Sequence, residues 1–251
     1  MPQPRTPHPA ALHTSIQLIK QVLTDALCLL LPIQCAICAV PDTRLCKPCE
    51  VQLEAVGDSP ESFERPVDLD FPVYAAASYE GITRTALLNF KENSAPHLKR
   101  VLGALLARAI DEALRIHSGM TLHCVPVPSA TEAVAKRGYR HVELLLAAQH
   151  PRPEIYRWLV ARRERADQVG LTSVQRRQNA RNSFRVTARV RSRVSVREQN
   201  DSRPLAGKHV LLVDDIVTTG ASLTAAANAL EDAGARVVAA VTVAHTPRIF
   251  A

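Results

Sequence analysis

Two adjacent carboxylates, Asp214 and Asp215, directly follow a short apolar run at residues 210–213. A continuous run of Val and Leu predicts a buried strand of a parallel sheet, and ligands bind at the carboxyl ends of such strands. After the acids, a short turn leads into a helix expected at residues 222–233. The turn and the start of this helix offer hydroxyls, backbone amides and one glycine, in the order Thr218, Thr219, Gly220, Ala221 and Ser222.

This turn has the composition of a phosphate site. Backbone amides in a turn, together with the N-terminus of the following helix, form a pocket for a dianionic phosphate. Gly220 would let the backbone approach the ligand closely. An alternative is that the aspartates and threonines only cap the helix. The order of buried strand, acid pair, hydroxyl-rich turn and helix favours the phosphate site.

A second set of candidate ligands consists of four cysteines near the N-terminus. Cys35 and Cys38 form one pair with two residues between them, and Cys46 and Cys49 form another. Two such pairs complete the tetrahedron that zinc prefers, which predicts a closed structural site without an open position for catalysis. A pair of disulfides in an exported protein, or a site that has lost its metal, are the alternatives. Cys28 and Cys124 lie in apolar surroundings and are interpreted as core residues.

Positive charge is concentrated in one segment of the 251-residue chain. The formal net charge is +7, yet residues 161–203 alone contain twelve arginines and four acidic residues, a difference of +8. An anionic partner is therefore expected to meet this segment. No apolar run approaches the length of about 20 residues that a membrane span requires, and no signal peptide is evident, so a cytoplasmic location is expected.

The hydrophobic pattern predicts an α/β protein with four segments. We expect an N-terminal tail and helix at 1–31, a zinc ribbon at 32–56, a linker at 57–72 and a larger domain at 73–251. Strands that alternate with long helices imply a parallel sheet covered by helices. Strands are expected at 75–79, 122–127, 155–160, 210–213 and 237–243, and helices at 83–90, 97–116, 134–148 and 222–233.

The stretch that contains Asp214 and Asp215 resembles the signature of type I phosphoribosyltransferases. The resemblance implies that the acid pair holds the ribose hydroxyls, that magnesium binds with them, and that the turn from Thr218 to Ser222 holds the 5′-phosphate. In this family the loop after an earlier strand meets the pyrophosphate. Lys136 and Arg137 occupy that position here, and cations suit a leaving group on which negative charge accumulates.

Further motifs narrow the resemblance to the ComF or GntX-type amidophosphoribosyltransferases, over nearly the whole chain from residue 32 to 246. The similarity implies a zinc ribbon at the cysteines and a mobile flap at residues 161–184 that excludes water from the reacting centre. It also implies reaction roles for Lys91, Arg137, Arg162, Arg163 and Arg176. The matching residues are Tyr79, Glu80, Gly81, Phe90, Lys91, Gln168, Leu171, Arg176, Asn179 and Phe184.

Two departures from the family pattern affect the expected function. Thr218 stands where many of these transferases have an acidic residue that helps to deprotonate a nucleobase, which argues against ordinary base salvage. The family usually has Gly-Phe-Asn-Gln after the arginine of the pyrophosphate region. This chain has Gly138, Tyr139, Arg140 and His141 there, so the sequence does not predict the amide contacts that the family makes at this place.

The resemblance implies a protein that binds phosphoribosyl pyrophosphate or a 5-phosphoribosyl nucleotide. It further implies a role in competence, the uptake of transforming single-stranded DNA, with an uptake channel and a replication-restart helicase as partners. The basic segment could bind the DNA backbone, although aromatic residues make up only 4% of the chain. A sensor without catalysis and a base-salvage transferase are the alternatives. The sequence indicates neither the acceptor nor the oligomeric state.

Overall fold

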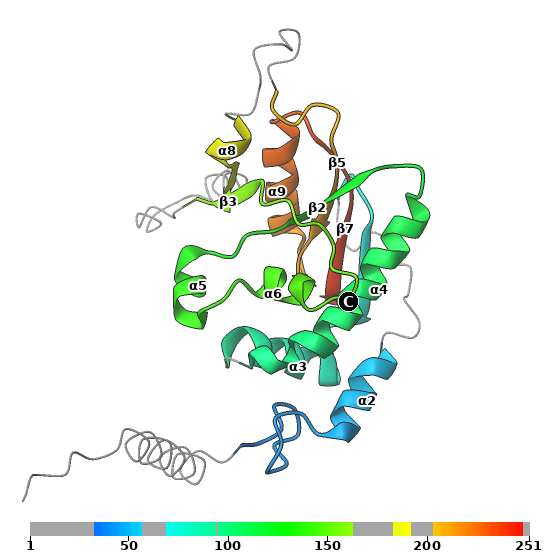
Figure 1. Cartoon of the computed structure of the whole chain (residues 1–251), viewed down its shortest axis with the longest axis vertical. Coiled ribbons are helices and arrows are strands. Elements are labelled where there is room, and N and C mark those ends of the chain that lie inside the picture. Colours follow the sequence, from blue (N-terminus) through cyan, green and yellow to red (C-terminus); the bar gives the residue numbers. More distant parts are fainter. Residues whose placement is uncertain (1–32, 57–68, 94, 163–182, 192–202, 248–251) are drawn as a thin grey trace, which may run out of the picture. The chain divides into compact units, whose positions relative to one another are not determined.

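The computed structural model of the chain describes residues 33–56, 69–93, 95–162, 183–191 and 203–247 (Figure 1). By internal contacts the chain forms two compact units, Met1–Cys46 and Lys47–Ala251. Helix α2 (Lys47–Val56), part of the stretch 32–56 in which a zinc ribbon was expected, contacts α3 (Gly81–Glu92) and α4 (Lys99–Ile116). The expected domain bounds stay a prediction.

The described part of the smaller unit is a tight turn around the first two cysteines. Gln34 pairs with Pro41 in an antiparallel bridge. The Cys35 N–H donates to the Val40 carbonyl at 2.8 Å, and the Ala36 N–H donates to the Arg44 carbonyl at 2.9 Å. These backbone bonds fold the chain back on itself, so that residues distant in sequence lie close to Cys35.

The larger unit contains a parallel sheet, as predicted. Its strands lie in the order β1-β7-β5-β2, and each neighbouring pair is parallel. The two-residue strand β6 pairs with the end of β7, also in parallel. The strands are β1 (Val73–Ser78), β2 (Leu122–Pro126), β5 (His209–Val213), β6 (Ile216–Val217) and β7 (Arg236–His245).

Helices cover the sheet, so the prediction of an α/β fold with a helix-flanked parallel sheet is confirmed. Helix α9 (Ala221–Glu231) contacts β5 and β7, and an antiparallel pair, β3 (Leu159–Ala161) and β4 (Phe184–Val186), packs on α9 (Figure 1). The shorter elements are a 3-10 turn (Pro96–Leu98), α5 (Thr131–Arg137), α6 (His141–Ala147) and α8 (Ala188–Arg191).

One helix expected from the sequence, at 134–148, is two helices. Gly138 ends α5 in the left-handed conformation, with φ of +81°, and its N–H donates to the Val134 carbonyl at 2.8 Å. Glycine adopts this conformation at the end of a helix without steric cost. The break lets α6 begin at His141 in a new direction.

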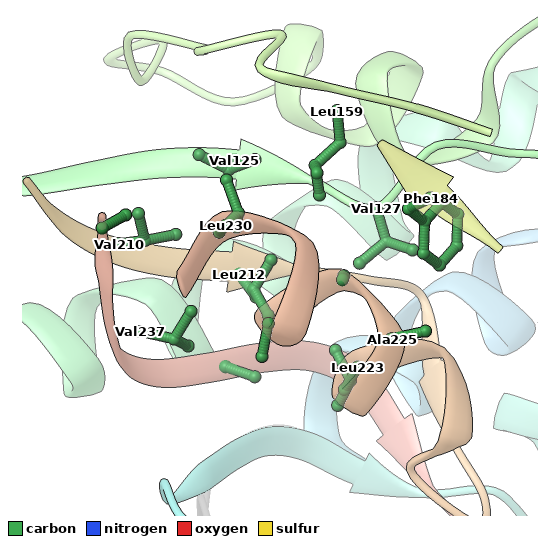
Figure 2. Close-up of a cluster of buried hydrophobic side chains, with 14 of the residues drawn as sticks. Val125, Val127, Leu159, Phe184, Val210, Leu212, Leu223, Ala225, Leu230 and Val237 are labelled. Atoms are coloured by element: carbon green, nitrogen blue, oxygen red, sulfur yellow. The ribbon is translucent and has the colours of Figure 1, made fainter. Parts of the chain in front are cut away.

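The core beneath α9 is built from alternate residues of the central strands. Val210 and Leu212 of β5 meet Leu223 and Leu230 of α9 in one buried cluster (Figure 2). The intervening Leu211 and Val213 are also buried, and because side chains alternate along a strand they point to the other face. Helix α4 packs against β1, β7 and α6 with its own apolar stripe.

Leu69 and Phe71 belong to the cluster beneath α9 as well, with exposed fractions of 4% and 5%. The segment 57–72 was expected to be a linker, yet its last residues pack into the core just before β1. Its earlier residues, 57–68, lie outside the described part of the chain. Proline and acidic residues are frequent in this segment, and this composition led to the expectation of a linker.

Helices α4 and α6 approach each other closely at Gly103, which yields a test of the packing. A Cβ at this position would lie 2.9 Å from the Leu145 carbonyl oxygen and 3.3 Å from the Ala148 Cβ. Gly103→Ala should therefore lower the free energy of unfolding by about 1 kcal/mol or more, although alanine is the better helix former. Urea denaturation would measure the change.

Gly119→Ala is the matched control, because nothing lies within 4 Å of the Cβ that it would add. Its effect should stay within about 0.5 kcal/mol, as for most surface substitutions. Equal stability of the Gly103→Ala variant and the wild type would contradict the close packing of α4 on α6.

Candidate phosphoribosyl and zinc sites

The acid pair lies where β5 ends, and the backbone of β7 holds it there. The Asp214 N–H donates to the Val241 carbonyl at 3.0 Å. The Asp215 carbonyl accepts from the N–H groups of Val243 and Ala244 at 3.0 and 3.1 Å. Both side chains are buried, with 8% of Asp214 and 2% of Asp215 exposed. The pair is thus fixed to the central sheet at the edge where parallel sheets bind ligands.

Two helices bring nitrogen groups to Asp215. Lys91, in the last turn of α3, places its Nζ 2.9 Å from Asp215 Oδ2 and 3.3 Å from Oδ1. His141, the first residue of α6, places its Nε2 3.1 Å from the same Oδ2. Among the described residues, Asp214 has no ion pair. Its Oδ1 instead accepts a hydrogen bond from the Asp215 N–H at 2.9 Å.

This difference in partners separates the pKa values of the two carboxyls. Burial, together with the negative charge of Asp215, raises the pKa of Asp214 well above its ordinary value. Burial alone would also raise the pKa of Asp215, but the interactions with His141 and Lys91 outweigh it and hold this pKa below the usual range. Burial would lower the pKa of Lys91, yet the Asp215 carboxylate more than offsets that effect and raises it.

A second layer of polar contacts surrounds His141. Its Nδ1 lies 2.9 Å from Arg137 Nη1 and 2.8 Å from Ser129 Oγ. Arg137 is itself buried, and its Nη2 lies 3.7 Å from Glu92 Oε1. The Tyr139 hydroxyl donates to the Phe90 carbonyl and so joins the loop after α5 to the end of α3. These contacts tie the end of α5, which carries Arg137, to the acid pair.

The hydroxyl-rich turn follows β6 and leads directly into α9. Thr218 and Thr219 are exposed, whereas Gly220 is buried with φ of +75°. Glycine is favoured in this left-handed conformation, so the turn depends on it. The first residues of α9, Ala221 and Ser222, are exposed. An anion could therefore reach the hydroxyls and amides at the start of this helix.

The structure thus brings together part of the expected site. Lys91 contacts the acid pair directly, and Arg137 reaches it through His141. Lys136 is exposed and lies 3.7 Å from Glu92 without contacting either aspartate. Arg162 follows β3, and its backbone N–H donates to the Ser183 carbonyl at 2.8 Å. The described contacts do not join its side chain to the acids. Arg163 and Arg176 lie outside the described residues, as does most of the expected flap.

His141 is a site residue that the sequence analysis did not identify as functional. It was noted only as a departure from the Gly-Phe-Asn-Gln pattern. A lone histidine at the start of a short helix carries no periodic signal, and its contact with Asp215 joins positions 74 residues apart (215 − 141). The one available hint was its position four residues after Arg137 in the expected pyrophosphate loop.

The acid pair has the chemistry to hold magnesium. Mg²⁺ prefers carboxylate and hydroxyl oxygens, and Asp214 and Asp215 supply carboxylates at an edge where a ribose could supply hydroxyls. Burial and the charge of Asp215 raise the pKa of Asp214, and the nearby Lys91 offsets only part of this effect. A bound divalent cation would supply further positive charge. The donor set therefore fits the expected magnesium.

The four cysteines near the N-terminus come together. Their Sγ atoms all lie within 4.8 Å of one another, and Cys38 Sγ and Cys46 Sγ are 3.5 Å apart. A tetrahedron with Zn–S bonds of about 2.3 Å has edges of about 3.8 Å. Burial raises the pKa of Cys35, but the amides of Cys38, Cys46 and Ile37 outweigh it and lower this pKa to about 6. Cys35 is thus poised as a thiolate, the form that binds metal.

No disulfide joins any of the five described cysteines, which are Cys35, Cys38, Cys46, Cys49 and Cys124. Cys124 is buried in β2, and burial raises its pKa to about 11, as expected for an inert core residue. Cys28 lies outside the described residues. The cluster Cys35, Cys38, Cys46 and Cys49 could therefore hold a metal such as zinc.

Removal of one thiolate should release zinc from this cluster. Cys38→Ser leaves three sulfur ligands, so the purified variant should contain much less than one zinc per chain and should lose the metal to a mild chelator. Elemental analysis would measure the content. Cys124→Ala, which removes a thiol outside the cluster, should keep the wild-type zinc content. A zinc-free wild-type protein, purified with metal in the medium, would contradict the assignment.

Comparison with known proteins supports the identification of the fold. Residues 160–248 match the family model of the phosphoribosyl transferase domain, a stretch that includes the acid pair, the hydroxyl-rich turn and α9. No curated protein matches the chain. The match spans less than half of the chain, and it does not distinguish the ComF branch from other branches. Together with the parallel sheet, it supports placing the α/β domain in the phosphoribosyltransferase superfamily.

Proposed function

We propose that this protein binds 5-phosphoribosyl pyrophosphate with magnesium at the edge of its parallel sheet. Asp214 and Asp215 would hold the ribose hydroxyls and the cation. Thr218, Thr219, Gly220, Ala221 and Ser222 would hold the 5′-phosphate, and Lys136 and Arg137 would meet the pyrophosphate. The phosphoribosyl transferase domain match supports a function of the phosphoribosyltransferase type.

The proposal depends chiefly on one observation. Two buried carboxylates, only one of them compensated by a lysine, lie between β5 and a turn that opens onto a helix N-terminus. A helix cap alone would not require a second, uncompensated buried charge, because burial of an unpaired carboxylate is costly. A cation and a polyol ligand would satisfy this charge. The geometry therefore favours a ligand site over a capping motif.

Removal of one charge from the acid pair should weaken binding. Calorimetry with 5-phosphoribosyl pyrophosphate and Mg²⁺ should show binding to the wild type, and Asp214→Asn should weaken it by about tenfold or more, because hydrogen bonds to charged groups contribute about 1.5–3 kcal/mol. Asp214→Asn is preferred to Asp215→Asn, which would also strand the buried Lys91. Asp232→Asn, at an exposed acid, is the control and should bind normally.

Binding and turnover can be separated by one further assay. A transferase releases pyrophosphate when it is mixed with 5-phosphoribosyl pyrophosphate and its acceptor, whereas a sensor binds without release. Pyrophosphate release would be measured against a panel of bases and amines. Release that is lost in Asp214→Asn identifies a catalyst, including the base-salvage alternative if a nucleobase is the acceptor. Binding without release across the panel favours the sensor.

The arginine-rich segment supports a second proposal, a role in competence. Such a protein would act in the cytoplasm on transforming single-stranded DNA, together with uptake and helicase proteins. Residues 161–203 carry a charge difference of +8, and Arg185 of β4 is exposed. Lys and Arg residues bind nucleic acid mainly through phosphates. No helix among the described residues is long and apolar enough to cross a membrane.

Binding of single-stranded DNA through this segment should weaken steeply with salt. For single strands each phosphate contact adds about 0.7 to the slope of log K against log salt concentration. Replacement of Arg185 and Arg197 by Gln should therefore make the slope shallower by roughly 1.4. The same changes at Arg84 and Arg100, both exposed on other helices, should leave it unaltered. Absent or salt-independent binding would refute the DNA role.

A further inference from the structure

His141 lies between a cation and a carboxylate that belong to different parts of the site. Its Nδ1 is 2.9 Å from Arg137 Nη1, and its Nε2 is 3.1 Å from Asp215 Oδ2. The side chains of Arg137, His141 and Asp215 are each less than a tenth exposed, at 8%, 9% and 3%. Water is therefore largely excluded from this row of contacts, which increases the strength of each.

The chemistry of arginine determines the direction of these hydrogen bonds. A guanidinium has only donors, so His141 Nδ1 must accept from Arg137. The ring hydrogen then sits on Nε2, the nitrogen that lies 3.1 Å from Asp215 Oδ2. Ser129 Oγ, 2.8 Å from Nδ1, helps to hold the ring in place. In a histidine of this kind, the partner of one nitrogen sets the role of the other.

The same assignment of the hydrogen excludes His141 as a metal ligand beside Asp214 and Asp215. The ligand atoms of His141, Asp214 and Asp215 lie within 4.8 Å of one another, as in a small metal site. A metal ligand must present an unprotonated nitrogen, whereas the contact with Arg137 assigns the hydrogen to Nε2. His141 therefore presents an N–H toward Asp215 and does not compete for a metal.

We propose that His141 is a positioning residue through which Arg137 acts on the ribose-binding carboxylate. Arg137 fixes the tautomer and orientation of the imidazole, and the imidazole orients Asp215. Arg137 thus contributes to binding of the ribose even when no pyrophosphate is present. This inference rests on the proposed function, because it concerns the ribose side and the pyrophosphate side of that same site.

A double-mutant cycle with ribose 5-phosphate and Mg²⁺ tests this inference. The ligand lacks the pyrophosphate group, so it offers Arg137 nothing that the proposed function assigns to this side chain. Calorimetry on the wild type, Arg137→Met, His141→Ala and the double variant gives the four affinities. Coupled neighbours interact by about 0.5–3 kcal/mol, so Arg137→Met should weaken binding about fivefold in the wild type. It should have no further effect in His141→Ala.

Conservative replacements of His141 separate positioning from mere packing. Gln ends three bonds from Cβ, as Nε2 does, and can offer an amide N–H to Asp215. Asn ends two bonds from Cβ, as Nδ1 does, and can reach only toward Arg137. His141→Gln should therefore restore most of the affinity lost in His141→Ala, whereas His141→Asn should not. Arg140→Met, which removes an exposed cation on the same loop, controls for net charge and should leave the affinity unchanged.

Nitrogen NMR of His141 provides a readout that needs no ligand. The wild type should show the tautomer with hydrogen on Nε2, because Arg137 donates to Nδ1 and the Asp215 carboxylate faces Nε2. The opposite tautomer in the wild type would overturn the inference, and this holds even if His141→Ala does not fold. Equal effects of Arg137→Met in both backgrounds would overturn it too, because Arg137 would then act directly. If the folded wild type binds neither ribose 5-phosphate nor 5-phosphoribosyl pyrophosphate, the proposed function itself fails.

Discussion

Two neighbouring carboxylates are buried at the end of β5, and the architecture of the larger unit accommodates the cost of burying them. Like charges at adjacent positions repel each other, and burial in a medium of low dielectric constant disfavours each of them. The backbone of β7 prevents the pair from moving toward solvent, because it bonds to both residues. Cations and hydrogen-bond donors placed near the two carboxylates lower the cost of burying them. Helices α3 and α6 do this with Lys91 and His141.

These partners do not compensate the two carboxylates equally, and this difference bears on the proposed function. Lys91 and His141 both serve Asp215, whose pKa is held low, whereas the pKa of Asp214 is raised by burial and by its neighbour. The ionised form of Asp215 is thus stabilised by two neighbours, whereas the ionised form of Asp214 would be stabilised by a further cation. Separated pKa values in adjacent titratable groups are common at functional sites. Here they suggest that magnesium, arriving with its ligand, would complete the site.

The fold was more predictable from the sequence than the site. Residues 210–213 were expected as a buried strand and 237–243 as a strand, and the structure confirms both. Continuous apolar runs of this length are typical of the strands of a parallel sheet. The apolar periodicity continues across Gly138, and for this reason one helix was expected at 134–148. The structure has two helices because Gly138 adopts the left-handed conformation that ends α5. Leu69 and Phe71 were assigned to a linker because their burial depends on residues far away in sequence.

The same limit explains what was and was not foreseen at the site. Asp214, Asp215 and the hydroxyl-rich turn form one contiguous motif, so their neighbourhood follows from local sequence alone. His141 joins them through tertiary contacts, and no local pattern encodes a contact between the start of α6 and the end of β5. Arg163 and Arg176 were expected in a flap, and their positions lie outside the described residues.

The position of His141 depends in turn on packing that is remote from any ligand. Helix α6 carries His141 at its first residue and rests on α4, where Gly103 allows the Leu145 carbonyl to come close. A larger residue there would push α6 outward and carry the imidazole with it. Such a shift would lengthen the distance of 3.1 Å between His141 Nε2 and Asp215 Oδ2 and weaken their interaction. A glycine in the middle of a helix is unfavourable for the helix itself, but at position 103 it lets α6 lie where His141 can face Asp215, between β5 and β6.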